Sequence, residues 1–361
     1  MVIPNSHIQS VKEILHHLPY TTTHLPGVGG EIKAAPEHFQ VEEILPYAPC
    51  GEGEHVFVTL RRAGWNTADV AAALAKCFGL KSMEVGWGGR KDKQAVTTQT
   101  FSLHLSMSTP MDRIEATLTE LPFTILSVQR HRNKLKTGHV ARNRFRILIT
   151  QTAPGAIDAA TAIAEAIRHN GIPNFYGEQR FGIEKANIDR AMQLVERQRP
   201  ARGKQEAFLV SVIQSALFNI WLTERIGRNQ YHQILAGDVA QKTDTGGLFV
   251  VDDVDEAMER FGRGAIVYTG PIFGPKMMAA GHPAAEFEAQ VLSRFDLDLD
   301  TFKRLKAPGA RRQAVLRVDD LTVRSEQNGL ELAFTLPPGA YATMITREFM
   351  RPARKEHIWR H

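Results

Sequence analysis

The sequence of 361 residues contains only two cysteines, Cys50 and Cys77. Two thiols cannot supply a framework of several disulfides or a four-cysteine zinc site, and such sparse use is typical of a reducing compartment. The N-terminal segment lacks the basic start and apolar middle of a signal peptide, and no apolar run approaches the roughly 20 residues that a membrane-spanning helix needs. These absences predict a cytoplasmic protein without a membrane segment.

The common nucleotide-binding and hydrolase signatures are also missing. The sequence has no GxxxxGK[ST] loop, no GxGxxG, no GxSxG elbow and no HExxH pair. The glycine clusters at residues 27–30 and 86–89 lack a third glycine at the right offset, so they predict turns. None of the 14 histidines has a convincing metal-ligand spacing. An ATPase, a dehydrogenase and a metalloenzyme are therefore disfavoured, and we expect no metal and no cofactor.

The composition is that of a folded protein, with 43% hydrophobic and 23% charged residues, and the length favours two domains. The formal net charge of +5 is compatible with a polyanionic partner without requiring one. Residues 130–146, RHRNKLKTGHVARNRFR, concentrate positive charge and contain no acidic residue. Taken alone, this basic run indicates a solvated surface as readily as a surface that binds a polyanion.

An α+β class is predicted by strand-like and helix-like segments that alternate in the first half of the chain. Residues 54–60 have the β-branched and aromatic content of a strand, whereas residues 66–80 begin with an Asn66 or Thr67 cap and have helical apolar spacing. An amphipathic helix is expected over residues 111–121. Further strands are expected over residues 96–105, 123–131 and 144–150.

After about residue 155 the pattern becomes predominantly helical, and the most apolar segment, residues 206–227, should lie in the middle of a helical domain. Strand patterns return near the C-terminus, at residues 313–318, 320–325 and 330–336, before a helical segment at residues 341–350. This order favours a helical domain inserted into a sheet domain whose last strands follow the insertion.

The most informative stretch is GGRKDKQAVTTQTFSL, residues 88–103. It places Asp92 between Lys91 and Lys93 in a turn that leads into a strand, and nearby opposite charges favour the ionised form of a carboxylate. An exposed ion pair in a charged loop, of little energetic value, is the alternative interpretation of these three residues.

The same stretch resembles the most characteristic motif of the TruD family of pseudouridine synthases, in which a glycine, one residue and Lys-Asp-Lys lead to Ala-Val-Thr and a glutamine. Three further stretches resemble motifs of that family: PEHF with GEGEH over residues 36–55, NFYGEQRFG over 174–182 and LPPGAYATMITRE over 336–348. The four blocks occur in family order and span nearly the whole chain, so their joint chance occurrence is remote. In the first motif the matching residues are Gly89, Lys91, Asp92, Lys93, Ala95, Val96, Thr97 and Gln99.

The resemblance implies an α+β fold made of two parts. A pseudouridine synthase catalytic domain with a mixed antiparallel sheet would comprise residues 1–170 and 317–361, and a family-specific, largely helical α+β domain would be inserted over residues 171–316. It also implies that uridine 13 in the D arm of certain tRNAs is isomerised to pseudouridine, with Asp92 as the catalytic carboxylate. We expect tRNA as the partner and a monomeric chain.

The reaction itself explains why a carboxylate is required. It breaks the bond between N1 and C1′, turns the base and rejoins it through C5, without net redox change and hence without need of a cofactor. A carboxylate near C1′ acts either as the nucleophile or as the base that generates a glycal intermediate. The sequence leaves both routes open.

A base extruded from its stack is held by aromatic rings and by hydrogen bonds to its edges. Asn143 and Phe145 lie two apart on an expected strand, so they point to the same side. The resemblance adds Phe39 and Tyr341, the latter in place of the phenylalanine of the family, which retains a ring but adds a hydroxyl that needs a partner. Phe39 and Phe145 could instead be core residues, and Asn143 a residue of a strand edge or turn.

Lys91 is a candidate for keeping Asp92 ionised or for contacting the RNA backbone, with Lys93 and Arg90 as alternatives. The basic run becomes a surface that follows the phosphates of the RNA. Its candidate contacts are Arg130, Arg132, Lys134, Lys136, Arg142 and Arg144.

Two other functions compete with this interpretation. One is a non-catalytic RNA-binding protein or RNA chaperone on the same fold, which the presence of Asp92 disfavours. The other is an RNA nuclease that uses Asp92 with Glu or His partners, against which the lack of a recognisable carboxylate cluster for metal counts.

Overall fold

The structure, a computed structural model, describes residues 4–351. Within this range the chain forms two compact units. The first, here called the sheet unit, comprises His24–Arg168, Val318–Ala342 and the described residues from Phe349 onwards. The second, the helical unit, comprises the described residues up to Thr23, His169–Arg317 and Thr343–Glu348.

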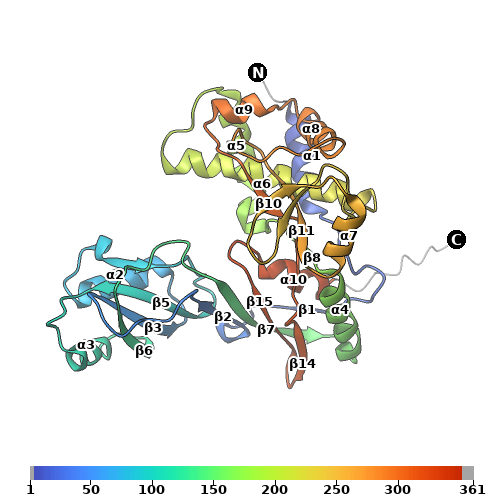
Figure 1. Cartoon of the computed structure of the whole chain (residues 1–361). Coiled ribbons are helices and arrows are strands. Elements are labelled where there is room, and N and C mark those ends of the chain that lie inside the picture. The colour runs from blue at the N-terminus through green and yellow to red at the C-terminus, as the bar shows by residue number, and fades with distance from the viewer. Residues whose placement is uncertain (1–3, 352–361) are drawn as a thin grey trace. The chain divides into compact units, whose positions relative to one another are not determined.

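The sheet unit is built on one large sheet (Figure 1). Its helices are α2 (Thr67–Cys77), α3 (Met111–Leu118) and most of α4 (Ala156–Asn170). Its strands are β1 (Gly29–Glu31), β2 (Phe39–Ile44), β3 (His55–Arg62), β4 (Val85–Trp87), β5 (Val96–His104), β6 (Thr124–His131), β7 (Arg142–Thr152), β14 (Thr322–Glu326) and β15 (Gly329–Leu336).

The nine described strands of this sheet follow the order β14-β15-β7-β2-β5-β3-β6, with β1 beside β7 and β4 beside β5. Strand β2 pairs in parallel with β5, and the other pairings are antiparallel. The predicted mixed sheet and α+β class are therefore confirmed. Strands β2, β5 and β7 lie side by side although they come from distant parts of the first half of the chain.

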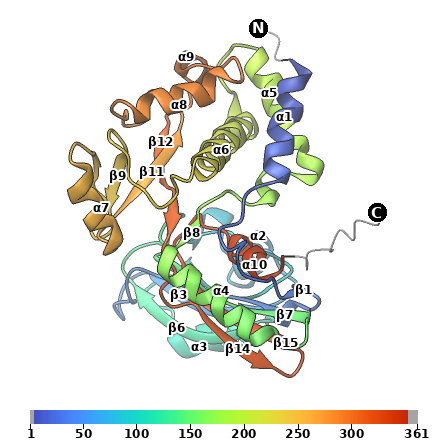
Figure 2. The ribbon, with the colours of Figure 1, turned by 90° about the vertical axis from the view of Figure 1, so that its right-hand side faces the viewer.

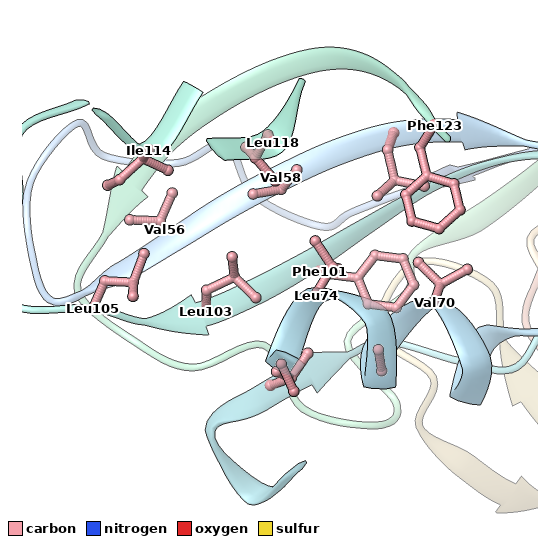
Figure 3. Packing of buried hydrophobic residues seen from close by; sticks show 14 residues of the cluster. Val56, Val58, Val70, Leu74, Phe101, Leu103, Leu105, Ile114, Leu118 and Phe123 are labelled. Carbon is pink, nitrogen blue, oxygen red and sulfur yellow. The ribbon is translucent and has the colours of Figure 1, made fainter. Parts of the chain in front are cut away.

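The periodicity that predicts these elements also explains their packing. Asn66 caps α2, since its side-chain oxygen accepts a hydrogen bond from the Asp69 backbone N–H at 3.0 Å. Apolar residues of β3 and β5 alternate toward α2 and α3, where Figure 3 shows Phe101 beside Val70 and Leu74. This core holds the strands that carry the candidate site.

The helical unit has α1, α5 and α6 packed against one another, as Figure 2 shows, together with a small four-stranded sheet of order β10-β9-β11-β12. Its helices are α1 (Asn5–His16), α5 (Ala186–Glu196), α6 (Gly203–Gly227), α7 (Val254–Gly262), α8 (Ala284–Ser293), α9 (Leu299–Arg304) and most of α10 (Ala342–Phe349). Its strands are β8 (Ile172–Pro173), β9 (Val239–Lys242), β10 (Leu248–Val250), β11 (Ile266–Ile272), β12 (Ala310–Gln313) and β13 (Val315–Leu316).

Helix α6 contradicts the expectation that the chain has no long apolar segment. By length and composition alone it is apolar enough to cross a membrane, contrary to the expectation that no such run exists. In the structure 72% of its most apolar window is buried inside the protein. It is the central helix of the helical unit, which is the position that its apolar faces predict.

The division into units differs from the expected domains at the N-terminus. Residues up to Thr23 were assigned from the sequence to the catalytic domain, but α1 packs on α5 and α6 of the helical unit. The sequence of α1 could not indicate the unit to which it belongs, because an amphipathic helix shows which of its faces is apolar but not which partner covers it.

Candidate active site

Asp92 lies in the loop that joins β4 to β5. The loop is held before Asp92, because the side-chain amide of Gln99 donates to the Gly89 carbonyl at 2.7 Å and the Lys91 backbone N–H donates to the Thr67 hydroxyl at 2.9 Å. It is held after Asp92 by the Gly64 backbone N–H, which donates to the Lys93 carbonyl at 3.2 Å. Gln99 belongs to β5 and Thr67 is the first residue of α2. The position of Asp92 is thus set by the body of the sheet unit.

The cation that pairs with Asp92 is Lys33. Its Nζ lies 2.7 Å from Asp92 Oδ2 and 4.6 Å from the centre of the Phe39 ring. Lys33 has a φ of 63°, a left-handed conformation that is uncommon for residues other than glycine and that often marks functional sites. One lysine therefore connects the proposed catalytic carboxylate with a proposed pocket aromatic.

Asp92 is ionised at neutral pH. Burial raises the pKa of its carboxyl, but the hydrogen bond from Lys33 and the Gln94 backbone N–H at 3.1 Å outweigh burial and leave the pKa below its ordinary value of 3.8. The side chain keeps 34% of its surface exposed. Asp92 is therefore a charged carboxylate that a substrate can reach.

The aromatic residues predicted for the pocket form a cluster beside this pair. The rings of Phe39 and Phe145 meet edge to face with centres 6.1 Å apart, and Phe145 stacks on Phe334 at 5.4 Å. Phe39 and Phe145 are only 6% and 8% exposed. Both rings therefore belong to the core, which is the alternative named from the sequence, and Phe39 also borders the Lys33–Asp92 pair.

Lys91 is oriented away from the role first considered for it. Its Nζ pairs with Glu43 Oε2 at 2.7 Å, and the two side chains are 9% and 0% exposed. The candidates named from the sequence for holding Asp92 ionised were Lys91, Lys93 and Arg90, whereas the partner observed is Lys33. Lys33 lies 59 positions from Asp92 and no motif in the sequence pointed to it.

Glu43 and Lys91 are part of a buried polar network behind the loop. Gln99 Nε2 donates to Glu43 Oε2 at 3.2 Å, and Arg62 Nη2 donates to Gln99 Oε1 at 3.0 Å and to the Thr67 hydroxyl at 3.3 Å. Burial lowers the pKa of Arg62 to about 10, while the charge of Glu43 acts in the opposite direction. Of these, Gln99 was noted from the sequence only as a motif match, and Glu43 and Arg62 were missed.

Asn143 lies directly opposite Glu43 on β7, so the two side chains share a face of the sheet. Phe145 is opposite Val41 and is on the same face as Asn143, as its spacing predicts. Asn143 Oδ1 and Glu43 Oε1 are both buried without a hydrogen-bond partner among the described residues. Tyr341 is half-buried in the segment between β15 and α10.

The basic run separates into structural and exposed side chains. Arg130 is only 8% exposed, and its guanidinium donates to the backbone carbonyls of Gly53, Ser106 and Thr109 at 2.8–3.2 Å. It is therefore a structural residue, which corrects its assignment as an RNA contact. The other five candidates lie at or near the surface: Arg132 pairs with Glu52, Arg144 pairs with Glu42, Lys134 donates to the Met83 carbonyl, and Arg142 and Lys136 are exposed.

No group of three or more His, Cys, Asp or Glu side chains in residues 4–351 could hold a metal ion. The acidic partners that a nuclease would need around Asp92 are therefore missing from the described part of the chain. The cation beside Asp92 is supplied by Lys33 instead.

Known proteins are similar to this chain in sequence and in fold. The model of the family described as tRNA pseudouridine synthase D (TruD) matches residues 16–197 and 200–349. The chain is 39% identical over 342 residues to a tRNA pseudouridine synthase D of Thermus thermophilus, with 94% of each chain covered, and 39% identical over 343 residues to that of Anaeromyxobacter dehalogenans (strain 2CP-C), with 92% of this chain and 96% of the relative covered.

A solved structure shows the same fold. The crystal structure of the putative tRNA pseudouridine synthase D from Methanosarcina mazei superposes with a TM-score of 0.74, covers 98% of this chain and 99% of its own, and is 22% identical in sequence. At that identity the likeness concerns the fold alone, and it agrees with the mixed α+β architecture described above.

Proposed function

This chain belongs to the tRNA pseudouridine synthase D (TruD) family, and we propose that it isomerises a uridine of tRNA, at position 13 in the D arm, with Asp92 as the catalytic carboxylate. The observation that carries the proposal is the reachable, ionised Asp92 held by Lys33 beside the Phe39 ring. The family supports isomerisation of uridine in tRNA, while the position and the residue are our inference.

The chemistry fits one carboxylate without further reagents. The bond between C1′ and N1 breaks, a bond between C1′ and C5 forms, the hydrogen on C5 leaves to water and N1 gains a proton. Asp92 either attacks C1′ or removes a sugar proton to give a glycal, and both routes need it charged at the start. The hydrogen bonds that lower its pKa maintain that charge.

The target base would be held beside this carboxylate. Extrusion from the stack costs a few kcal/mol, which contacts in the pocket must offset. Phe39 offers a ring next to Lys33, and Asn143, half-buried on β7, offers its amide to an edge of the uracil. Tyr341 and Phe145 complete the proposed pocket, and Lys91 acts by anchoring Glu43.

The phosphates of the RNA would lie on surface cations of the basic run, of which Lys134 is half-buried and the others are exposed. After the correction of Arg130, these are Arg132, Lys134, Lys136, Arg142 and Arg144. We also propose that the protein is a cytoplasmic monomer that needs no cofactor. In this proposal the catalytic domain, residues 1–170 and 317–361, carries out the reaction, and the inserted domain, residues 171–316, contributes to tRNA recognition. Sedimentation analysis of the purified chain tests the monomer.

The decisive experiment follows the C5 hydrogen. Purified protein is incubated with tRNA that carries tritium at uridine C5, and tritium released to water is counted. Wild type should release it, Asp92→Ala should be slower by at least about 10³-fold, and the matched surface variant Asp158→Ala should equal wild type. Equal release by Asp92→Ala and wild type would refute the catalytic assignment.

The same assay separates the competing functions. Isomerisation should persist in EDTA. A two-metal nuclease would instead shorten the RNA without EDTA and lose its activity when EDTA is added. A wild-type protein that binds tRNA tightly but releases no tritium would be the non-catalytic RNA-binding protein. Mapping of the product by carbodiimide modification and primer extension should give a stop at the nucleotide immediately 3′ of position 13, and a stop elsewhere would refute the D-arm position.

A further inference from the structure

One hollow in the sheet unit shares no lining residue with the Asp92 site. It has a volume of about 440 Å³ and opens where β3 begins and β6 ends. We call it the histidine pocket, and its lining residues are Tyr47, His55, His131, Arg132, Asn133, Lys134, Lys136 and His139.

One wall of the histidine pocket is aromatic and already organised. The rings of Tyr47 and His131 stack with centres 5.2 Å apart at an interplanar angle of 16°, and buried Phe57 packs behind His131 at 4.8 Å. The Tyr47 hydroxyl lies 2.9 Å from His139 Nδ1, and the Cys50 backbone N–H donates to His131 Nδ1 at 3.3 Å. These contacts fix the rings before any ligand binds.

One ring nitrogen among the residues that line the histidine pocket has no hydrogen-bond partner in residues 4–351. His55 lies opposite His131 in the pairing of β3 with β6, and its Nδ1 is buried without a hydrogen-bond partner in the described part of the chain. Burial and the neighbouring His104 lower the pKa of His55, so its imidazole is neutral at pH 7 and can donate or accept. The half-buried ring of His55 suits the polar edge of a base.

Positive charge lies at the rim of the histidine pocket. Lys134 and Lys136 line it, and the same two lysines line a second hollow of about 380 Å³ that contains Trp87 and Met83. Met83 is 75% exposed. Two hollows, each with an aromatic side chain, thus flank one pair of cations, which is the arrangement that consecutive unpaired nucleotides require.

The segment that carries these lysines is joined to the catalytic loop. The Gly138 backbone N–H donates to the Gly88 carbonyl at 2.8 Å, and Gly88 stands four residues before Asp92. Four residues of extended chain span at most about 14 Å. An RNA strand that reaches Asp92 therefore passes near this segment.

We propose that the histidine pocket binds an unpaired nucleotide of the RNA substrate other than the uridine that is isomerised. Its base stacks beside the wall of Tyr47 and His131 and meets His55 with its polar edge, while its phosphate lies on Lys134 and Lys136. An inorganic anion would use only the lysines and leave the aromatic wall without a role. This inference rests on the proposed function, because it takes the ligand to be the same RNA.

The test measures binding rather than turnover, in full-length Asp92→Ala protein. Substrate tRNA carrying a fluorophore is titrated and the anisotropy is followed at fixed salt concentration. Lys134→Gln with Lys136→Gln should raise Kd at least tenfold, because two phosphate contacts are lost. The control, Lys76→Gln with Lys81→Gln, changes the same charge on exposed lysines of the same unit and should stay within twofold.

The contribution of the base is measured separately. Uridine 5′-monophosphate should shift the imidazole Cε1–H signals of His131 and His139 in the NMR spectrum, and Tyr47→Leu should abolish the shift while circular dichroism shows an unchanged fold. Inorganic phosphate at the same concentration should leave both signals in place. Equal shifts with phosphate would reduce the pocket to an anion site and overturn the proposal.

Two outcomes distinguish a failure of the proposed function from a failure of the histidine pocket. If wild type releases no tritium, the proposed function fails, whatever the anisotropy shows. If wild type releases tritium but the lysine pair and its control bind tRNA equally, the isomerase stands and the histidine pocket is refuted.

Discussion

Each unit buries a charged cluster, and the two clusters differ in how completely their polar atoms are paired. In the helical unit Arg225 and Asp238 are 0% and 3% exposed, and Arg225 donates to both carboxylate oxygens at 2.8 and 2.6 Å. Its remaining donors reach the carbonyls of Gln230 and Gln233, and the Tyr268 ring lies 4.0 Å from the guanidinium carbon. The guanidinium nitrogens of Arg225 and both carboxylate oxygens of Asp238 thus all have partners among the described residues.

The cluster behind the Asp92 loop is incomplete by comparison. Glu43 Oε1, Arg62 Nη1 and Asn143 Oδ1 are buried without hydrogen bonds to described residues. Buried polar atoms are almost always paired, and exceptions concentrate at sites that a ligand or water completes. The difference indicates that the Arg225 cluster stabilises the fold, whereas the unpaired atoms of the Glu43 cluster support the proposal that a substrate binds beside the Asp92 loop.

The largest effect on stability should come from breaking the complete cluster. Arg225→Met leaves Asp238 charged and uncompensated, so we expect a loss of about 3–5 kcal/mol in the free energy of unfolding. The matched control Arg294→Met removes an arginine that is 48% exposed and pairs with Glu224, which should cost less than about 1 kcal/mol. Urea unfolding measures both, and equal losses would show that the burial of Arg225 has no special role.

Breaking the incomplete cluster should affect both stability and rate. Glu43→Gln keeps the shape but leaves buried Lys91 without a counter-charge, which should cost about 2–3 kcal/mol and lower tritium release about tenfold or more by disturbing the loop of Asp92. Glu42→Gln is the control, because Glu42 is 47% exposed and pairs with Arg144 on the other face of β2. Unfolding and single-turnover kinetics test this, and a normal rate in Glu43→Gln would assign the cluster to stability alone.

Within the basic run, Arg130 should differ from the exposed cations by affecting stability rather than tRNA binding. Arg130→Met should destabilise the fold by about 1–2 kcal/mol, because three carbonyls lose a charged donor, yet tRNA affinity per folded molecule should stay within about twofold. Arg132→Met, at a side chain 70% exposed, should leave stability unchanged. If Arg130→Met weakens tRNA binding more than Arg132→Met does, the structural assignment of Arg130 is wrong.

The smallest effect is expected from Lys33 and concerns pH. The pKa of Asp92 is depressed in the folded protein, so the ionised form is present at all pH values above about 4 and is lost as the pH falls through the folded-state pKa. Lys33→Met removes the main opposing interaction and leaves burial, which raises the pKa. The acid limb of the pH–rate profile should therefore move to higher pH, while Lys93→Met should leave it in place. An unchanged limb in Lys33→Met would show that Lys33 does not set the charge of Asp92.

Much of the fold could be predicted from the sequence because its signals are local. The β-branched and aromatic content of β3 and the Asn66 cap of α2 each extend over a few residues, and the structure contains both elements within a few positions of the expected bounds. The four short strands β9 to β12 were missed, since elements of three to seven residues carry little periodic signal.

The residues of the candidate site could be predicted from the sequence only in part. Asp92 and Asn143 were named because short motifs contain them, and Phe39 because a family resemblance does. Lys33 and Glu43 were not, because their partners lie 59 and 48 positions away and a lysine or glutamate in a polar segment has no distinguishing local pattern.

The amino-acid sequence by itself determined the family, the mixed α+β class and the presence of one acidic residue in a lysine-flanked turn, since each depends on neighbours along the chain. Only the tertiary structure decided which cation holds Asp92, that Arg130 is internal and that Lys91 faces Glu43. Charges act through space over a few ångströms, and the path of the chain through the sheet sets those distances.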